Sequence, residues 1–305
     1  MRLDDYDPNI DVEDQGDRGR SAGGGGLGGG LLFAFLPMIF NRFGCAGVAV
    51  VLLVFFLFSG GTQFLSGGGQ TGSSGYSASV GSQAGSRTGA ATVCTTNADY
   101  KTACNAFSSA NKTWASLFQR AGEGYAAPKL RFYENNGESG CGAAQSAMGP
   151  FYCPGDRGIY LDTSFFQELS QRFGAPGDFA QDYVIAHEFG HHIQNLMGIS
   201  DRVTRLQRSS NEVQGNRLSV MLELQADCFA GVWAAQNRDR MDPDDLQEGM
   251  TAAKAIGDDT LQKETQGRVV PDSFTHGTSE QRMTWLKRGI DSGDYKQCDT
   301  FAGAI

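Results

Sequence analysis

The five residues His187-Glu188-Phe189-Gly190-His191 combine the side chains that a hydrolytic zinc site requires. Histidines four positions apart lie on one face of a helix, so both imidazoles can reach one metal ion. The carboxylate of Glu188, beside the first histidine, can hold a metal-bound water and accept its proton. The chain has two other histidines, His192 and His276. Because so short a motif also arises by chance, the rest of the chain must supply the missing parts of a site.

A catalytic zinc needs a third protein ligand and one open position. Glu223 and Asp227 are four residues apart in an otherwise apolar stretch, residues 220–233, and so share one face of a predicted helix. Burying two carboxylates is costly unless they are paired or bound to a metal. We therefore predict Glu223 as the third ligand and Asp227 as the acceptor for the free ring N–H of His187. The alternative is that both are solvent-facing helix charges.

Two neighbours of the motif are expected to be structural. His192 points roughly a third of a turn away from His191 on a helix, so we interpret it as a core residue or one that supports a ligand, rather than as a ligand. A glycine inside a helix costs about 1 kcal/mol relative to alanine. Gly190 therefore indicates that another backbone approaches the motif closely.

A second polar cluster lies at residues 274–282, with the sequence FTHGTSEQR. His276 precedes a helix expected to begin near Ser279, and Arg282 follows within that helix. Peptide hydrolysis at a zinc site develops an oxyanion, which a histidine or arginine can stabilise. We predict His276 as a catalytic residue and Arg282 as a supporting one. The alternative is a helix cap with a salt bridge.

Apolar periodicity predicts a mostly helical α+β domain with a small β-sheet and no internal repeat. The predicted strands are residues 129–133 and 158–162, and the second of these could be the sheet edge that holds an extended substrate. The predicted helices are residues 97–119, 165–173, 178–197 and 212–237, one beginning at 242–243 and one beginning near 279.

The segments before this domain differ from it in composition. Residues 1–42 are acidic and then glycine-rich and are expected to be a disordered tail, residues 43–65 form an apolar transmembrane helix, and residues 66–92 form a Gly/Ser-rich linker to the domain at 93–305. Arg18, Arg20 and Arg42 precede the apolar segment, and residues 43–86 contain neither lysine nor arginine. The positive-inside rule therefore predicts a single pass, with the N-terminus cytoplasmic and the domain outside. A cleaved signal peptide is the alternative.

Six of the seven cysteines follow the apolar segment, and an even number in an oxidising compartment predicts disulfides. Fifteen pairings are open, and the sequence does not choose among them. Short loop closures favour Cys94–Cys104 and Cys141–Cys153, which leaves Cys228 with Cys298. No two cysteines have CxxC spacing, so a zinc ribbon is not expected. The net charge of −9 argues against a nucleic-acid partner.

Four segments together resemble the bacterial neutral zinc metallopeptidase family, whose members carry a Gly-rich tail and a membrane anchor. They are CGAAQSAMGPFYCPGDRGIYLD, YVIAHEFGHHIQ, LELQADCFAGVWA and FTHGTSEQR, within residues 141–282. The resemblance implies a gluzincin-type, zincin-like fold with one Zn²⁺ per chain, bound by His187, His191 and Glu223, and Glu188 as the base. His191 and Glu223 are 32 residues apart, which is longer than in thermolysin-like enzymes.

The expected protein is a zinc endopeptidase anchored in the bacterial inner membrane, acting on protein or peptide substrates on its outer face. Two alternatives stay open. One is an interaction protein with a structural zinc, closed by His276 or a cysteine as a fourth ligand, although such a site has no need of Glu188. The other is a zinc amidase acting on cell-wall material. The sequence predicts no oligomeric state.

Overall fold

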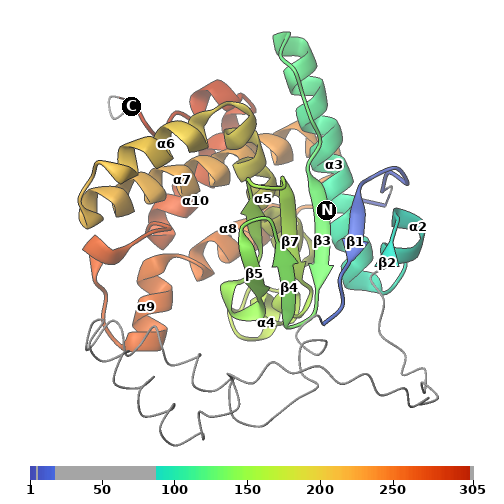
Figure 1. Ribbon diagram of the computed structural model, residues 1–305, viewed down its shortest axis with the longest axis horizontal. Coiled ribbons are helices and arrows are strands. Elements are labelled where there is room, and N and C mark those ends of the chain that lie inside the picture. Colours follow the sequence, from blue (N-terminus) through green and yellow to red (C-terminus); the bar gives the residue numbers. More distant parts are fainter. Residues whose placement is uncertain (5, 18–86, 303–305) are drawn as a thin grey trace, which may run out of the picture. The chain divides into compact units, whose positions relative to one another are not determined.

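The computed structural model describes residues 1–4, 6–17 and 87–302 (Figure 1). The predicted transmembrane helix, residues 43–65, lies outside these residues, as do most of the predicted linker and the glycine-rich part of the tail.

Helices make up most of this structure, as predicted. Several begin at the polar cap that their sequence provides: the side chain of Asn97 accepts from the Tyr100 N–H, and Thr278 and Gln281 form a capping box. The helices are α2 (Ala90–Val93), α3 (Ala98–Ala121), α4 (Ser164–Gln171), α5 (Asp178–Leu196), α6 (Ile199–Arg208), α7 (Glu212–Gln236), α8 (Asp245–Ala255), α9 (Asp258–Gln266) and α10 (Ser279–Ser292).

The main sheet is mixed and has five strands in the order β2-β1-β3-β7-β6. Its inner strands β1, β3 and β7 are parallel to one another, and β2 and β6 pair antiparallel at the two edges. A separate two-stranded hairpin consists of β4 and β5. The strands are β1 (Val12–Asp14), β2 (Arg87–Thr88), β3 (Lys129–Tyr133), β4 (Asn136–Ser139), β5 (Gly142–Gln145), β6 (Phe151–Cys153) and β7 (Gly158–Asp162).

The predicted role of β7 as the sheet edge is wrong. β7 lies between β3 and β6, and all five of its residues are buried. An inner strand has both rows of backbone hydrogen bonds occupied, so it cannot receive a substrate strand. The edge is β6, which the sequence did not reveal because it has only three residues in a cysteine-, proline- and glycine-rich stretch.

The expectation of a disordered N-terminal tail does not hold for the described residues among the first 17. Val12 is buried and pairs with Leu130 of β3, so β1 is an inner strand of the sheet. The predicted linker also ends earlier than residue 92, because β2 and α2 belong to the folded unit. Acidic composition suggested a solvated segment, but the strands that pair with β1 lie far along the chain, β2 at residues 87–88 and β3 at 129–133.

Helix α7 packs against α5 on one side and α10 on another, and backbone meets backbone at both contacts. A Cβ on Gly190 of α5 would come within 2.9 Å of the Ala226 carbonyl oxygen, as predicted from a glycine inside this helix. A Cβ on Gly289 of α10 would lie 2.0 Å from the Cys228 carbonyl oxygen. The two glycines set the spacing of the three helices that carry the polar motifs.

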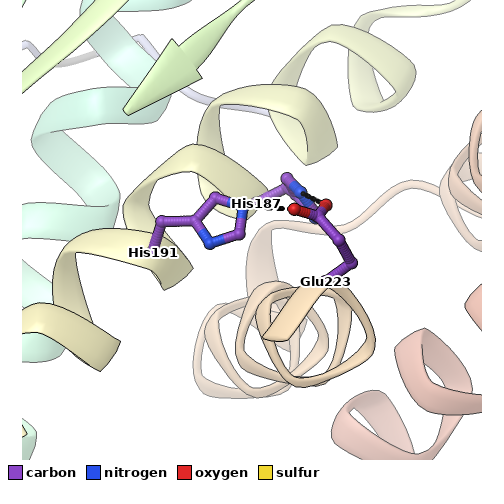
Figure 2. A group of neighbouring side chains, drawn as sticks. All are labelled: His187, His191 and Glu223. Carbon is purple, nitrogen blue, oxygen red and sulfur yellow. Dashed lines mark hydrogen bonds and ion pairs between the residues drawn. The ribbon is translucent and has the colours of Figure 1, made fainter. Parts of the chain in front are cut away.

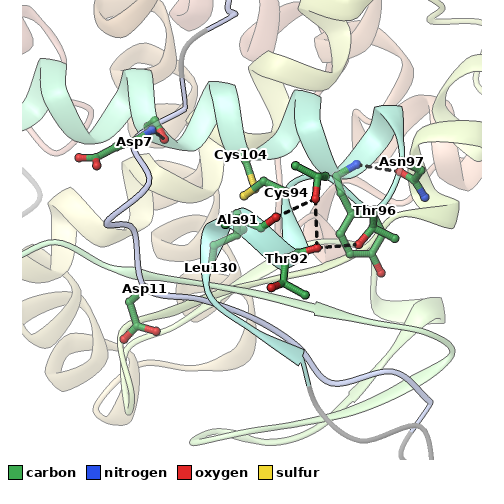
Figure 3. The surroundings of a disulfide bond; sticks show 12 residues. Asp7, Asp11, Ala91, Thr92, Cys94, Thr96, Asn97, Cys104 and Leu130 are labelled. Atoms are coloured by element: carbon green, nitrogen blue, oxygen red, sulfur yellow. Dashed lines mark hydrogen bonds between the residues drawn. A yellow bond between two sulfur atoms is a disulfide. The ribbon is translucent and has the colours of Figure 1, made fainter.

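Three disulfides join Cys94 to Cys104, Cys141 to Cys153 and Cys228 to Cys298, which confirms the predicted pairing. The first links the end of α2 to α3 (Figure 3). The second links the β4–β5 hairpin region to β6, and the third links α7 to the C-terminal segment.

Within the described ranges, α7 is also the helix that by length and composition could cross a membrane. Its most apolar window is 67% buried inside the structure, since α7 packs against α5 and α10. A core helix has this composition for the same reason that a membrane span does, because both are surrounded by apolar groups.

Candidate metal centre

The side chains of His187 and His191 on α5 and Glu223 on α7 converge on one point (Figure 2). One potential ligand atom from each lies within 4.8 Å of the others. Glu223 Oε2 is 3.1 Å from His187 Nε2, and Glu223 Oε1 is 3.4 Å from His191 Nε2. The structure thus brings together the three residues that the sequence proposed as ligands, two nitrogen donors and one carboxylate, which is a donor set suited to zinc.

Asp227 and Arg282 lie directly behind His187. The Asp227 carboxylate is 2.8 Å from His187 Nδ1 and receives two bonds of 2.8 Å from the Arg282 guanidinium. Burial would raise the pKa of Asp227, but Arg282 and His187 outweigh it and lower the pKa to about 2. A permanently ionised acceptor at Nδ1 leaves Nε2 of His187 directed at Glu223, as a ligand nitrogen must be.

Two further residues in these networks were missed by the sequence analysis. Tyr183 donates to Asp227 at 2.6 Å, and Gln194 Oε1 lies 2.9 Å from His191 Nδ1. Gln194 is itself held by the Leu222 carbonyl oxygen of α7 at 2.7 Å. Each missed residue lies three or four positions from a histidine on α5, so helical spacing was the signal that could have identified them.

The charged side chains of the site balance one another. Burial lowers the pKa of His187, but Asp227 and Glu223 more than offset it and raise the pKa to about 10. Burial likewise opposes the ionised form of Glu223, and the two histidines hold its pKa well below the ordinary value. Because a ligand nitrogen must give up its proton, metal binding at this site would compete with protons and weaken as the pH falls.

His276 lies on the same cavity as the three potential ligands, in the loop before α10. Its side chain is about half exposed, and its Nδ1 is 3.2 Å from Asp258 Oδ1. This hydrogen bond raises the pKa of His276. The Asp258 carboxylate also accepts the backbone N–H groups of Thr275, His276 and Gly277, so it fixes the whole loop. Thr278 of the same segment caps α10, and Arg282 forms a buried ion pair with Asp227, so the helix cap and the salt bridge of the alternative interpretation are both present. The catalytic role of His276 stays a prediction.

Glu188 and His192 are both buried but face different surroundings. Glu188 is 7% exposed and lines the cavity beside His187. His192 is fully buried, bonded to the Ala126 carbonyl oxygen at 2.7 Å and to the Tyr152 hydroxyl at 3.1 Å. Burial lowers the pKa of His192 to about 4, so it is a neutral core residue, as the sequence indicated.

The cavity has a volume of about 860 Å³ and runs between β6 and the α5–α7 pair. This volume falls in the range of ligand-binding clefts. Its polar end contains Glu188 and the three potential ligands, and its apolar part includes Phe151 of β6 and Phe165 and Phe173 around α4.

A fourth protein ligand is absent from the described part of the chain. All six cysteines in these ranges are in disulfides, and the group at the site contains three potential ligands. Three protein ligands and one open position are typical of catalytic zinc, whereas structural zinc is closed by four.

Comparison with known proteins gives a family match over most of the chain. Residues 5–301 match a family model described as "Putative neutral zinc metallopeptidase". "Uncharacterized protein YpfJ" of Escherichia coli K12 is 55% identical over 195 residues, which cover 63% of this chain and 68% of that relative. "Uncharacterized protein Rv2575" of Mycobacterium tuberculosis is 42% identical over 194 residues, or 59% of this chain and 64% of that protein. No solved structure matches the chain.

Proposed function

The chain belongs to the neutral zinc metallopeptidase family, and from this membership and the site geometry we propose that it is a zinc-dependent endopeptidase. The observation that carries the proposal is the convergence of His187, His191 and Glu223 at an open cavity, with Glu188 beside them. The domain would then be zincin-like, with its active site between α5 and α7.

Zinc bound by these three residues would polarise a peptide carbonyl and activate a water molecule. Glu188 accepts the proton of that water and passes it to the departing amine. Asp227 keeps His187 in the tautomer whose Nε2 is free, and Arg282 keeps Asp227 ionised. His276, fixed by Asp258, donates a hydrogen bond to the developing oxyanion.

The substrate is a protein or peptide that binds in extended form along β6. An edge strand has one row of backbone N–H and C=O groups available for pairing, and Phe151 and Tyr152 of β6 line the cavity. The apolar part of the cavity would accept a side chain of the substrate.

The enzyme acts outside the cytoplasm. Support for this location comes from the three disulfides, because such bonds are rare in the reducing cytosol of most bacteria and common in exported proteins.

Replacement of Glu188 by glutamine tests the mechanism in the purified full-length protein. We expect Glu188→Gln to keep the zinc content of the wild type and to lower kcat/KM on an unfolded protein substrate by about 100- to 10,000-fold, the usual contribution of a general base. Zinc is measured by elemental analysis and cleavage by mass spectrometry. Wild-type activity in this variant would refute the mechanism.

A parallel assay separates a peptidase from a cell-wall amidase. The wild type and Glu188→Gln are incubated with unfolded protein and with peptidoglycan, each with and without a chelator. Cleavage of the protein alone, abolished by the chelator and by Glu188→Gln, is the expected result. If the protein released peptides from peptidoglycan but did not cleave unfolded protein, it would be a cell-wall amidase instead.

A further inference from the structure

Strand β1 comes from the extreme N-terminal part of the chain, yet it has neighbours on both sides. It pairs antiparallel with β2, with Glu13 opposite Thr88, and parallel with β3, with Val12 opposite Leu130. Figure 1 shows this blue strand between β2 and β3. Without β1, β2 would have no strand to pair with and β3 would become an open sheet edge.

The acidic residues of this segment have specific basic partners in the domain. Asp14 is 2% exposed and forms an ion pair with Arg87. Arg131 of β3 forms ion pairs with both Asp11 and Glu13. A buried carboxylate is costly without a partner, so the burial of Asp14 requires that Arg87 be present beside it. The negative charge that suggested a solvated tail is instead matched within the fold.

Further contacts reach beyond the strand. Gln15 donates its side-chain amide to the Glu138 carbonyl oxygen and accepts the Glu138 N–H, at 2.9 and 2.8 Å. The Asp7 N–H donates to the Ser108 hydroxyl of α3. Figure 3 shows Asp7 and Asp11 in the surroundings of the Cys94–Cys104 disulfide. The segment thus contacts β3, β4 and α3, which are three separate elements of the domain.

These contacts constrain how the chain crosses the membrane, because the apolar residues 43–65 lie in the sequence between β1 and the other four strands of the sheet. A single crossing there would put β1 and β2 on opposite faces of a hydrocarbon layer about 30 Å thick. The ion pair between Asp14 and Arg87 and the β1–β2 pairing exclude such a separation in the folded protein.

We propose that residues 1–17 lie on the same, non-cytoplasmic side of the membrane as the domain and complete its sheet. The chain between Asp17 and Arg87 then crosses the membrane an even number of times, zero included. This inference replaces the predicted single pass with a cytoplasmic N-terminus. It depends on the proposed location outside the cytoplasm and is independent of the proposed catalysis.

Thiol accessibility in intact cells tests the side of the membrane directly. The full chain is expressed with Cys45→Ala, to remove the one cysteine outside the disulfides, and with Asp11→Cys or Lys287→Cys. The two native side chains are matched in exposure, at 58% and 59%. A membrane-impermeant maleimide is added to spheroplasts before or after lysis.

We expect both thiols to react to a similar extent before lysis. Reaction of Lys287→Cys before lysis and of Asp11→Cys only afterwards would overturn the proposal, because the N-terminal segment would then be cytoplasmic. Reaction of neither before lysis would overturn it as well, because the domain itself would be cytoplasmic. Neither result affects the Glu188→Gln experiment, which tests the catalytic proposal separately.

A cross-link tests the pairing itself in the membrane-bound chain. Glu13 and Arg131 are opposite one another in the β1–β3 register, within the Cα separation that a disulfide accepts. We expect Glu13→Cys with Arg131→Cys, in the Cys45→Ala background, to give a joined peptide pair in unreduced digests. The control pair, Glu13→Cys with Lys287→Cys on α10, should give none. Free thiols at both positions of the first pair, with no joined peptide, would contradict the pairing.

Discussion

Asp227 receives hydrogen bonds from three buried side chains, those of Tyr183, His187 and Arg282. Those bonds fix the ring of His187 and the tautomer that presents Nε2 to the site. His191 has a neutral counterpart of this arrangement in Gln194. The orientation of the two histidines therefore depends on residues that would never touch the metal ion.

The Asp227→Asn variant isolates this dependence. An amide can offer its nitrogen instead of an acceptor to His187, and it leaves Arg282 buried without a counter-charge. We expect zinc affinity to fall by about 10- to 100-fold, the usual cost of losing such a partner. Competition with a chromophoric chelator measures it, and the exposed Asp291→Asn on α10 should bind zinc as the wild type does. If Asp227→Asn bound zinc as tightly as the wild type, Asp227 would not position His187 for metal binding.

His192 gives a prediction about pH and stability. Its pKa is about 4 in the folded protein and about 6.5 when unfolded, so the unfolded state binds more protons between these values. The stability linked to neutral His192 is thus fully present above pH 6.5 and falls as the pH drops toward 4, by about 3 kcal/mol in total. Denaturant unfolding of the zinc-loaded protein across this range, compared with His192→Gln, measures it. A curve with the same pH slope in the variant would contradict the assignment.

Residue-level prediction from the sequence worked where one helix determines the spacing. Positions four apart share a helical face, which is why His187, His191, Glu223 and Asp227 could be identified before the fold was known. Asp258 could not, because it reaches the loop of His276 from another helix. A contact between two different helices or loops leaves no periodic pattern in the sequence.

At the scale of elements, the site depends on how closely α5 and α7 approach. Two ligands come from α5 and one from α7, so a shift between these helices changes the ligand geometry directly. Gly190 permits the approach, since its missing side chain leaves room for the backbone of Ala226.

The Gly190→Ala variant should therefore lose stability although alanine favours helices. Its Cβ would lie 2.9 Å from the Ala226 carbonyl oxygen, and overpacking of this kind costs about 1–3 kcal/mol. The matched control is Gly215→Ala in α7, where nothing lies within 4 Å and a gain of up to about 1 kcal/mol is expected. Thermal unfolding and zinc affinity are measured for both. A stabilised Gly190→Ala protein would show that the helices are free to separate.

The elements themselves were predictable to different degrees. Helices such as α3 and α10 begin at local capping signals and follow an apolar period, so the sequence places their ends closely. The strands β1 and β6 have three residues each and owe their existence to partners elsewhere in the chain. Such short strands have too few residues for alternation to be visible.

At the scale of the whole molecule, the disulfides close loops of very different length. Cys228 and Cys298 are separated by 70 residues, and Cys94 and Cys104 by 10. The longer loop constrains the unfolded chain more, so its bond should contribute more to stability. It also joins the ligand-bearing helix α7 to the end of the described chain.

Paired alanine substitutions check this order. We expect Cys228→Ala with Cys298→Ala to lower the free energy of unfolding by about 4 kcal/mol, and Cys94→Ala with Cys104→Ala by about 3 kcal/mol. All four sulfurs are fully buried, so the loss of packing is similar in the two variants. Denaturant unfolding under non-reducing conditions gives both values. A larger loss from the shorter loop would point to local strain or packing as the dominant contribution.

The position of β1 inside the sheet also constrains the order of events during synthesis. Its residues leave the ribosome well before both partner strands, because Thr88 of β2 follows Glu13 by 75 residues and Leu130 of β3 follows Val12 by 118. At about 5–20 residues per second, β1 waits on the order of 10 s before β3 exists. Folding of the sheet is therefore a late event, and until then β1 has to remain free of strands other than β2. A chain that carries seven acidic residues in its first 17 is well suited to that wait, because charge repulsion opposes premature association.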